Sequence, residues 1–301
     1  MNIDELNQAF GAIDLVVFKA GQGDLPMIHV HNASADAIVS VYGGQVLSFT
    51  PRSTGREMLF LSQLAYFAPG KAIKGGVPIC WPWFGADPEG QGRPAHGIAR
   101  NRMWSVYAVD SSVADRTVIT LGFDSDASTL AVWPHAFSMR LHVSVGDTLQ
   151  LALETTNSGT APFRLTQALH TYFSIGAIAQ TQVDGLDGRR FADKAHGGIA
   201  VTQSGPVTFG GEVDSVYADV GPELTIVDAA QNRNIVIRNQ GSTTAVVWNP
   251  WEAIAKSMAD LNDDDYHRFV CVETANAGAE IIDVAPGQTA RMVARYSDES
   301  R

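Results

Sequence analysis

A strict alternation of apolar and polar side chains constrains the fold of this chain more than any other feature. Between Phe137 and Val145 the sequence reads FSMRLHVSV, so every second residue is apolar and the residues between them are polar or charged. Side chains of a β-strand point alternately to opposite faces, and the pattern therefore predicts a strand with one face in the core. Leucines at every second position from Leu149 to Leu153 continue the pattern after a Gly-Asp pair, which predicts a hairpin.

Short β-branched and aromatic segments separated by turn residues make up most of the remaining sequence, a pattern typical of an all-β protein. Helical segments are predicted at residues 3–10 and 252–258, and both are short. The further predicted strands cover residues 14–19, 27–32, 37–42, 45–50, 104–109, 117–123, 163–170, 224–228, 234–238, 244–248, 269–273 and 291–296.

The chain shows no internal boundary. No Pro/Ser-rich linker and no shift in composition divides its 301 residues, so we expect a single domain spanning residues 1–301. So many short strands in one domain predict a sandwich or a related stacked-sheet architecture, with loops grouped along one concave side.

The net charge and the apolar content restrict the partners. A formal net charge of −11 argues against nucleic acid, because binding to a polyanion depends on a basic surface that neutralises phosphates. No apolar run is long enough to cross a bilayer, and Asp4 and Glu5 stand where a secretory signal needs positive charge. We expect a cytoplasmic protein without membrane contact, as a monomer or weak homo-oligomer. Cys80 and Cys271 lie in apolar surroundings without metal-ligand spacing, which predicts buried thiols.

Residues 71–102 are too rich in glycine, proline and tryptophan for a regular strand or helix. Such a composition predicts a structured loop with flat apolar walls, and long ordered loops commonly carry function. Lys74 lies near its start, and Arg100 and Arg102 lie at its end. Arginine recognises phosphate or carboxylate through a planar set of donors, although surface arginines are the more common situation. We expect this loop to help bind an anionic, ring-shaped small ligand.

Glu273 is a candidate general base. In the segment FVCVET it shares one strand face with Phe269 and Cys271, so it lies along an apolar row. A carboxylate in that position is costly unless it is paired, and desolvation raises its pKa toward the range useful for proton transfer. The alternative is a strand-end glutamate that already faces water.

His170 is a candidate partner for that base. It ends the predicted strand 163–170, on a face whose other members are polar or small and could line a cavity. Histidine donates or accepts a proton near neutral pH, so a histidine across a pocket from a glutamate forms a workable acid-base pair. A hydrogen-bonded structural histidine is the alternative.

Metal and nucleotide sites find little support. His29 and His31 share a strand face but lack a third ligand, so we interpret them as structural. The acidic run 260–265 imitates the start of a calcium-binding loop but has Asp265 in place of the obligatory glycine, which predicts a solvated turn. The sequence contains no P-loop, no Gly-x-Ser-x-Gly and no His-Glu-x-x-His motif. We expect no metal and no cofactor.

Five ordered segments together resemble the hexose-6-phosphate mutarotases, also called glucose-6-phosphate 1-epimerases, of the galactose mutarotase-like superfamily. They are IKGGVPICWPWFG at 73–85, HGIARN at 96–101, ALHTYF at 168–173, GEVDSVY at 211–217, and VVWNPW leading to FVCVETAN at 246–276. The resemblance spans nearly the whole chain. It implies a β-supersandwich fold with the substrate in a concave cleft.

The resemblance also implies roles for single residues. His170 and Glu273 match the catalytic histidine and glutamate of the family, and Asp214 matches an aspartate that contacts sugar hydroxyls. Lys74 and Arg100 match two cationic positions associated with the sugar phosphate. The family often has arginine at the first of these positions, and lysine offers a point charge in place of a planar fork of donors.

The implied reaction interconverts the α and β anomers of an aldohexose 6-phosphate through the open-chain aldehyde. Glu273 would take the proton of the C1 hydroxyl and His170 would protonate the ring oxygen. This requires an ionised glutamate and a protonated histidine at the start, and their mutual attraction favours those states. His96 would shape the cleft, and Arg102 is a weaker candidate for phosphate binding.

Two other functions stay open at this point. An aldose 1-epimerase acting on unphosphorylated sugars would use the same acid-base pair without a phosphate site. A non-catalytic sugar-binding module would use the tryptophans as stacking platforms, but it has no need of an opposed acid and base. A carbohydrate lyase on a related fold is a weaker alternative still.

Overall fold

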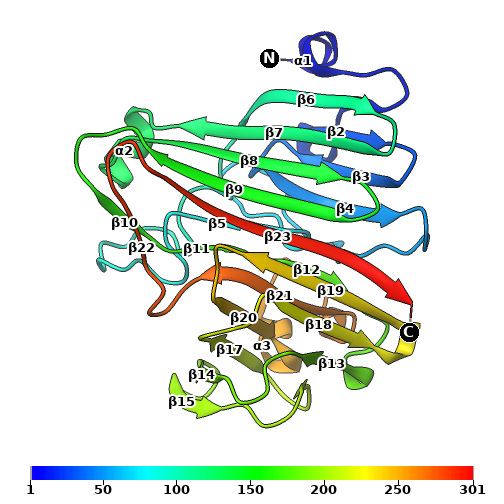
Figure 1. Ribbon diagram of the computed structural model, residues 1–301, viewed down its shortest axis with the longest axis vertical. Helices are drawn as coiled ribbons and strands as arrows, with labels where there is room; N and C mark the ends of the chain where they lie inside the picture. The colour runs from blue at the N-terminus through cyan, green and yellow to red at the C-terminus, as the bar shows by residue number, and fades with distance from the viewer. Residues whose placement is uncertain (1, 301) are drawn as a thin grey trace.

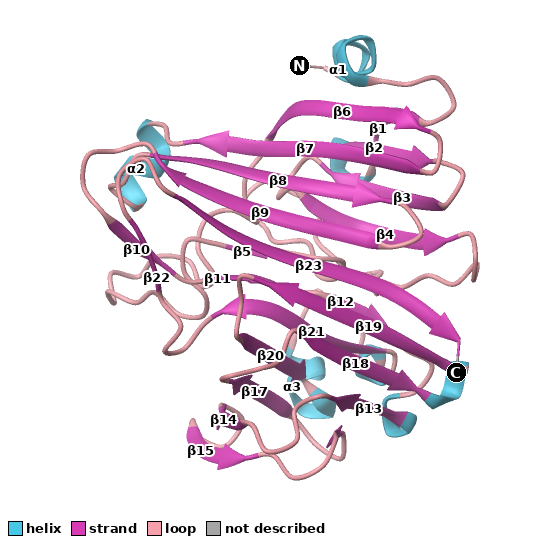
Figure 2. Ribbon diagram, viewed as in Figure 1, coloured by secondary structure: helices cyan, strands magenta, loops and turns pink. Residues whose placement is uncertain are grey.

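The computed structural model describes residues 2–300 and is dominated by β-strands, as predicted (Figures 1 and 2). The three α-helices in this range are short: α1 (Ile3–Phe10), α2 (Ala127–Val132) and α3 (Trp251–Ser257). Single 3₁₀ turns occur at η1 (Gln22–Asp24), η2 (Ile178–Gln180), η3 (Ala229–Gln231) and η4 (Asp265–His267). Helix α2 was not predicted. It begins with a capping box formed by Asp126 and Thr129.

One layer of the sandwich is a nine-stranded antiparallel sheet, which faces the viewer in Figure 1. Its order is β16 (Val207–Thr208), β13 (Thr181–Asp184), β18 (Glu223–Asp228), β19 (Arg233–Gln240), β23 (Thr289–Ser300), β9 (Leu149–Asn157), β8 (Phe137–Val145), β7 (Arg116–Asp124) and β6 (Ser105–Val113). Strand β8 covers the predicted residues, and every second side chain along it is buried. The hairpin between β8 and β9 is also confirmed.

Two further sheets lie behind this layer (Figure 1). An eight-stranded sheet has the order β15 (Ile199–Thr202), β14 (Arg190–Asp193), β17 (Val213–Tyr217), β20 (Thr244–Asn249), β21 (Phe269–Asn276), β11 (Gln167–Leu169) and β5 (Ile79–Cys80), with β12 (Tyr172–Ser174) beside β21. A four-stranded sheet contains β1 (Val16–Ala20), β2 (Pro26–His31), β3 (Ala35–Ser40) and β4 (Gln45–Pro51), and β10 (Phe163–Leu165) pairs with β22 (Ile282–Val284).

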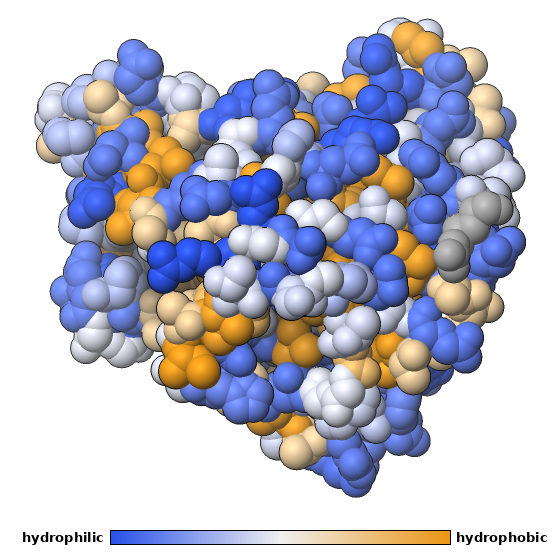
Figure 3. Space-filling model, turned by 60° about the horizontal axis from the view of Figure 1, so that its bottom comes forward, coloured by the Kyte–Doolittle hydropathy of each residue, from blue (hydrophilic) through white to orange (hydrophobic). Residues whose placement is uncertain are grey.

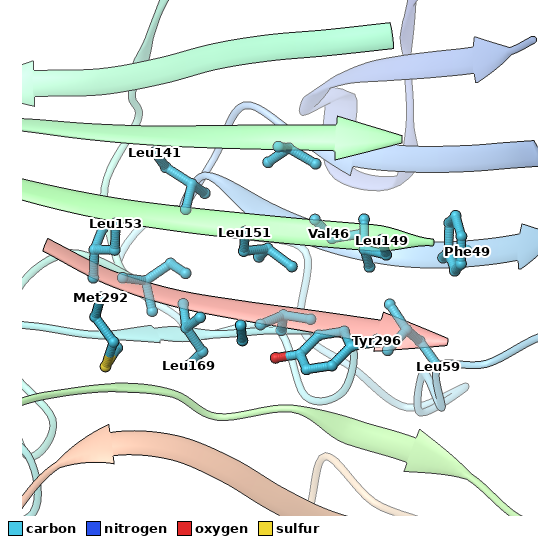
Figure 4. Close-up of a cluster of buried hydrophobic side chains, with 14 of the residues drawn as sticks. Val46, Phe49, Leu59, Leu141, Leu149, Leu151, Leu153, Leu169, Met292 and Tyr296 are labelled. Atoms are coloured by element: carbon cyan, nitrogen blue, oxygen red, sulfur yellow. The ribbon is translucent and has the colours of Figure 1, made fainter. Parts of the chain in front are cut away.

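The hydrophobic core fills the space between the layers. Figure 4 shows buried side chains of the nine-stranded sheet meeting buried side chains from the layer behind it, among them Leu141, Leu149, Leu151, Leu153, Met292, Val46, Phe49, Leu59 and Leu169. Full burial of one such side chain stabilises the fold by about 1.5–3 kcal/mol. A one-residue slip of β8 or β9 would turn its whole apolar row to solvent, so this core fixes the register of the strands. Strand β21 is buried along its entire length, including Glu273.

The predicted single strand over residues 163–170 is wrong. The segment forms two strands in different sheets, because β10 pairs with β22 whereas β11 pairs with β21 and β5. Thr166 interrupts the strand, since its N–H donates to the carbonyl of Pro82 at 3.1 Å and its hydroxyl accepts from the N–H of Phe84 at 2.9 Å. His170 therefore lies just beyond the end of β11, in the short connection to β12.

No helix within residues 2–300 is both long and apolar enough to cross a bilayer. Figure 3 shows the lower face of the molecule as hydrophilic residues mixed with small hydrophobic patches. Inside the molecule, Cys80 and Cys271 are buried and free, which confirms the prediction of two buried thiols.

Candidate active site

His170 and Glu273 lie side by side although they are 103 positions apart in the sequence. The Nε2 atom of His170 is 3.4 Å from Oε1 of Glu273, and the two side chains are 11% and 1% exposed. The register explains their meeting. In the ladders with β21, Leu169 at the end of β11 pairs with Thr274, and Tyr172 at the start of β12 pairs with Cys271. The connection between β11 and β12, which carries His170, therefore lies opposite Glu273. The structure thus brings together the two residues predicted as acid and base.

Aromatic rings hold the imidazole of His170. Tyr172 stacks on it with ring centroids 5.0 Å apart and planes inclined by 11°. Trp248 meets it edge-on at 5.9 Å, and His96 does so at 5.8 Å. The backbone N–H of His170 donates to the carbonyl of Pro78 at 3.0 Å. These contacts leave the ring one orientation, which a proton-transfer group requires.

The surroundings disfavour charge on both members of the pair. Burial raises the pKa of Glu273 well above its ordinary value, and the nearby carboxylate of Asp214 adds to the rise while Arg100 opposes it. Burial lowers the pKa of His170 well below its ordinary value, and His96, Arg100 and Lys74 add to that effect. Desolvation and the neighbouring charges thus oppose the ionised glutamate and the protonated histidine that we expect from the sequence, and the charge state of the pair stays a prediction.

His96 packs edge-on against the imidazole of His170. Its backbone N–H donates to the carbonyl of Gly85 at 2.7 Å, and its Nδ1 accepts from the N–H of Gly85 at 3.3 Å. Burial, together with Arg100 and Lys74, lowers the pKa of His96 to about 3, so its ring is neutral at physiological pH. The following Gly97 packs against Trp81 so closely that a Cβ atom would come within 1.9 Å of the Trp81 carbonyl oxygen.

Lys74 and Arg100 lie near the pair, since both contribute to the lowered pKa of His170 and of His96. Nζ of Lys74 is 3.5 Å from Oδ1 of Asp260. Nη2 of Arg100 donates to the carbonyl of Ala95 at 3.2 Å, and its buried Nε has no hydrogen-bond partner within residues 2–300. Two cations therefore border the acid-base pair, and one retains an unused donor.

Arg102 binds Asp126 through Nη2 at 2.9 Å and lies 4.5 Å from the ring of Phe123. Its buried Nε, like that of Arg100, has no hydrogen-bond partner within residues 2–300.

The acidic run 260–265 is not simply a solvated turn. Asp260 pairs with the distant Lys74, which the local sequence does not reveal. Asp265 is buried and accepts from the N–H of Asn262, three residues earlier, at 3.0 Å.

Asp214 lies on β17, two strands away from Glu273. It pairs with Trp248 of β20, which in turn pairs with Cys271 of β21, so all these side chains lie on the face that carries Glu273. Burial raises the pKa of Asp214, and the ammonium of Lys194 opposes the rise. Asp214 thus lies on the same face of the sheet as Glu273 and within electrostatic range of it.

Cavity size alone does not identify this site. A cavity of about 450 Å³ lies on the same sheet, but Arg190, Val216, Ala277 and Glu280 line it, and neither member of the acid-base pair does. The chemistry of the side chains is more informative than volume here. Within residues 2–300 there is no group of three or more potential metal ligands, and His31 instead contacts Asp36 and Arg52.

Comparison with known proteins places this geometry in context. Residues 26–297 match the sequence profile of the aldose 1-epimerase family. An Escherichia coli K12 protein provisionally named glucose-6-phosphate 1-epimerase is 40% identical over 266 residues, which are 88% of each chain. A Cenchrus ciliaris protein of the same provisional name is 35% identical over 91% of this chain and 84% of its own. A Salmonella typhimurium crystal structure, described provisionally as the mutarotase YeaD, is similar with a TM-score of 0.89 at 33% identity and covers 100% of both chains. Every residue of the site lies inside the matched range.

Proposed function

The chain belongs to the aldose 1-epimerase family and is an isomerase of the mutarotase type, and we propose that it interconverts the α and β anomers of aldohexose 6-phosphates as a glucose-6-phosphate 1-epimerase. The observation that carries the proposal is the 3.4 Å approach of His170 Nε2 to Glu273 Oε1 in a largely buried site. A sugar presents its ring oxygen and its C1 hydroxyl on the same carbon, so an acid and a base this close can reach both.

The proposed mechanism needs only proton transfers. Glu273 takes the proton from the C1 hydroxyl while His170 gives a proton to the ring oxygen, the C1–O5 bond breaks, and the open-chain aldehyde forms. Rotation about C1–C2 exposes the other face of the carbonyl. The C5 hydroxyl then attacks that face with the two roles reversed, so each residue returns to its first protonation state. Positioned acid-base groups of this kind contribute about 100- to 10,000-fold each.

Four residues have proposed binding roles. Lys74 and Arg100 hold the phosphate, supported by their place beside the pair and by the unused Nε donor of Arg100. Asp214 accepts hydrogen bonds from sugar hydroxyls at the rim, and His96 closes the wall as a neutral ring. We also propose that residues 1–301 act as one domain, supported by a core cluster that includes Leu6 and Tyr296, and that the protein works in the cytoplasm.

NMR exchange between the anomers of glucose 6-phosphate tests the acid-base assignment. The variants His170→Asn and Glu273→Gln should each lose about 100-fold or more of kcat. Circular dichroism would confirm that the variants fold. Folded variants with wild-type turnover would contradict the assignment.

Substrate selectivity tests the phosphate assignment against the alternative of an unphosphorylated sugar. Arg100→Ala should weaken kcat/KM for glucose 6-phosphate by about 10- to 100-fold, because it removes charge-assisted hydrogen bonds of about 1.5–3 kcal/mol. Glucose, which has no phosphate, should show no such loss. Arg102→Ala is the matched control, since Nη2 of Arg102 already binds Asp126. Equal losses for both sugars would favour an aldose 1-epimerase without phosphate preference.

A further inference from the structure

A buried polar cluster lies directly behind the acid-base pair. Thr171 follows His170 in the sequence, Thr274 follows Glu273, and both threonines are fully buried. Successive side chains along a strand point to opposite faces, so Thr274 points away from the site toward the nine-stranded sheet. Its hydroxyl donates to Oδ1 of Asn239 on β19 at 2.5 Å, which places the cluster between the layers.

Tyr296 connects Thr171 to this cluster. It lies on β23 among the core side chains of Figure 4, is fully buried, and packs edge-on against Phe173 at 5.0 Å. Its hydroxyl is 2.7 Å from Oγ1 of Thr171. Strand β23 pairs with β19, where Asn239 lies opposite Ala294, so the strand that carries Tyr296 neighbours the strand that binds Thr274.

The connection that carries His170 needs such a tie. The pairing of β21 with β11 ends at Thr274 and its pairing with β12 begins at Cys271, so no ladder pairing links residues 170–171 to β21. The N–H groups of His170 and Tyr172 donate to Pro78 and Gly76, on the loop side. Among the described residues, Tyr296 is the one side chain that hydrogen-bonds Thr171.

We propose that Tyr296 is a positioning residue, whose hydroxyl fixes the segment of His170 to β23. Strand β23 pairs with β19, and Asn239 of β19 binds Thr274 of β21, so this tie sets the 3.4 Å separation between His170 Nε2 and Glu273 Oε1. The proposal rests on the proposed epimerase function of that pair. Tyr296 touches neither reacting group and acts through Thr171. A misplacement of about 1 Å in such a pair costs about 100-fold in rate, so a single distant hydroxyl has a measurable effect.

The variant Tyr296→Phe removes the hydroxyl and keeps the ring. We expect kcat to fall about 10- to 100-fold while KM changes less than about two-fold, because substrate binding does not use Tyr296. Tyr217→Phe is the matched control. Its hydroxyl is also part of a buried tyrosine and donates to Oε1 of Gln203 at 2.8 Å, but it lies on β17 away from the pair. This control should lose some thermal stability and keep wild-type kcat.

Changes at the partner sharpen the test. Thr171→Ser keeps the hydroxyl and should stay near wild type, whereas Thr171→Val should match Tyr296→Phe. The double variant should be no worse than either single variant, because both remove the same link. Independent losses in the double variant, a loss in KM instead of kcat, or equal losses in Tyr296→Phe and Tyr217→Phe would overturn the proposal.

A second readout separates this proposal from the function on which it rests. The ¹⁵N signals of the His170 ring report its surroundings whether or not the protein turns over a sugar. They should shift in Tyr296→Phe and stay unchanged in Tyr217→Phe. If the wild type converts no aldose, the proposed function fails while shifted signals still support positioning. Unshifted signals overturn the positioning role even in an active enzyme.

Discussion

Replacing Glu273 by glutamine should stabilise the protein while removing its activity. Oε1 of this buried carboxyl group faces His170, and Oε2 has no hydrogen-bond partner within residues 2–300. An unpaired buried polar group costs about 1–3 kcal/mol, and more when it is charged. Glutamine keeps the shape without the charge, so we expect the free energy of unfolding to rise by about 1–3 kcal/mol at about pH 8. For a chain of this size that corresponds to roughly 2–6 °C in Tm.

The pH dependence of this stabilisation follows from the raised pKa of Glu273. A carboxyl group whose pKa is higher in the folded state contributes stability that is fully present below its unfolded value of 4.5 and is lost as the pH rises through the folded pKa. The glutamine variant lacks this loss, so its advantage should grow from about pH 5 to about pH 8. The lowered pKa of His170 has the opposite effect, since the stability that the neutral imidazole contributes is lost as the pH falls. His170 is present in the wild type and in the glutamine variant alike.

Urea unfolding at several pH values measures the difference. Glu223→Gln is the control, because Glu223 is half-exposed and binds Arg238 at 2.8 Å, so its loss should have little effect at any pH. A Glu273→Gln variant that is less stable than the wild type at about pH 8, or whose advantage shrinks as the pH rises, would refute the reasoning.

Two further substitutions test the ionic contacts. Asp260→Asn should raise kcat/KM for glucose 6-phosphate several-fold at low salt, because Asp260 lies 3.5 Å from Lys74 and competes with an incoming phosphate. Glucose is the control substrate. A fall in kcat/KM for glucose 6-phosphate would show that Asp260 orients Lys74 instead. Arg233→Met should lower the free energy of unfolding by about 3 kcal/mol in urea titrations, since the fully buried carboxylates of Asp228 and Asp298 each lose a cation. A change below about 1 kcal/mol would contradict that account.

The architecture was predictable where the side-chain period carries the information. Strand β8 begins and ends at the residues that the alternation predicts, because one buried face demands it. The break at Thr166 was not predictable in this way. It depends on hydrogen bonds with Pro82 and Phe84, which lie about 80 residues earlier in the chain, and the local sequence 163–170 contains no breaker.

The same distinction holds for the active site. The two-residue period placed Glu273 on an apolar face but left open a glutamate that faces water at the strand end. The side chain is 1% exposed, so it lies on the buried face. The partner of Lys74 and the tie through Tyr296 were not predicted, because each depends on segments that meet only in the folded chain. The desolvation and the neighbouring cations that shift the pKa values of the pair were not predicted either, because they do not appear in the spacing of residues.

The charge state of the pair connects the proposed phosphate site to the chemistry. Lys74 and Arg100 hold down the pKa of His170, so the unliganded protein resists forming the imidazolium that the proposed mechanism needs. A phosphate bound between these cations offsets their charge and removes part of that resistance, which raises the pKa of His170 when the correct substrate arrives. The phosphate then contributes to kcat as well as to KM. On this reasoning glucose should have both a higher KM and a lower kcat than glucose 6-phosphate, and inorganic phosphate added with glucose should restore part of the kcat. Equal kcat values for the two sugars would mean that the phosphate serves binding alone.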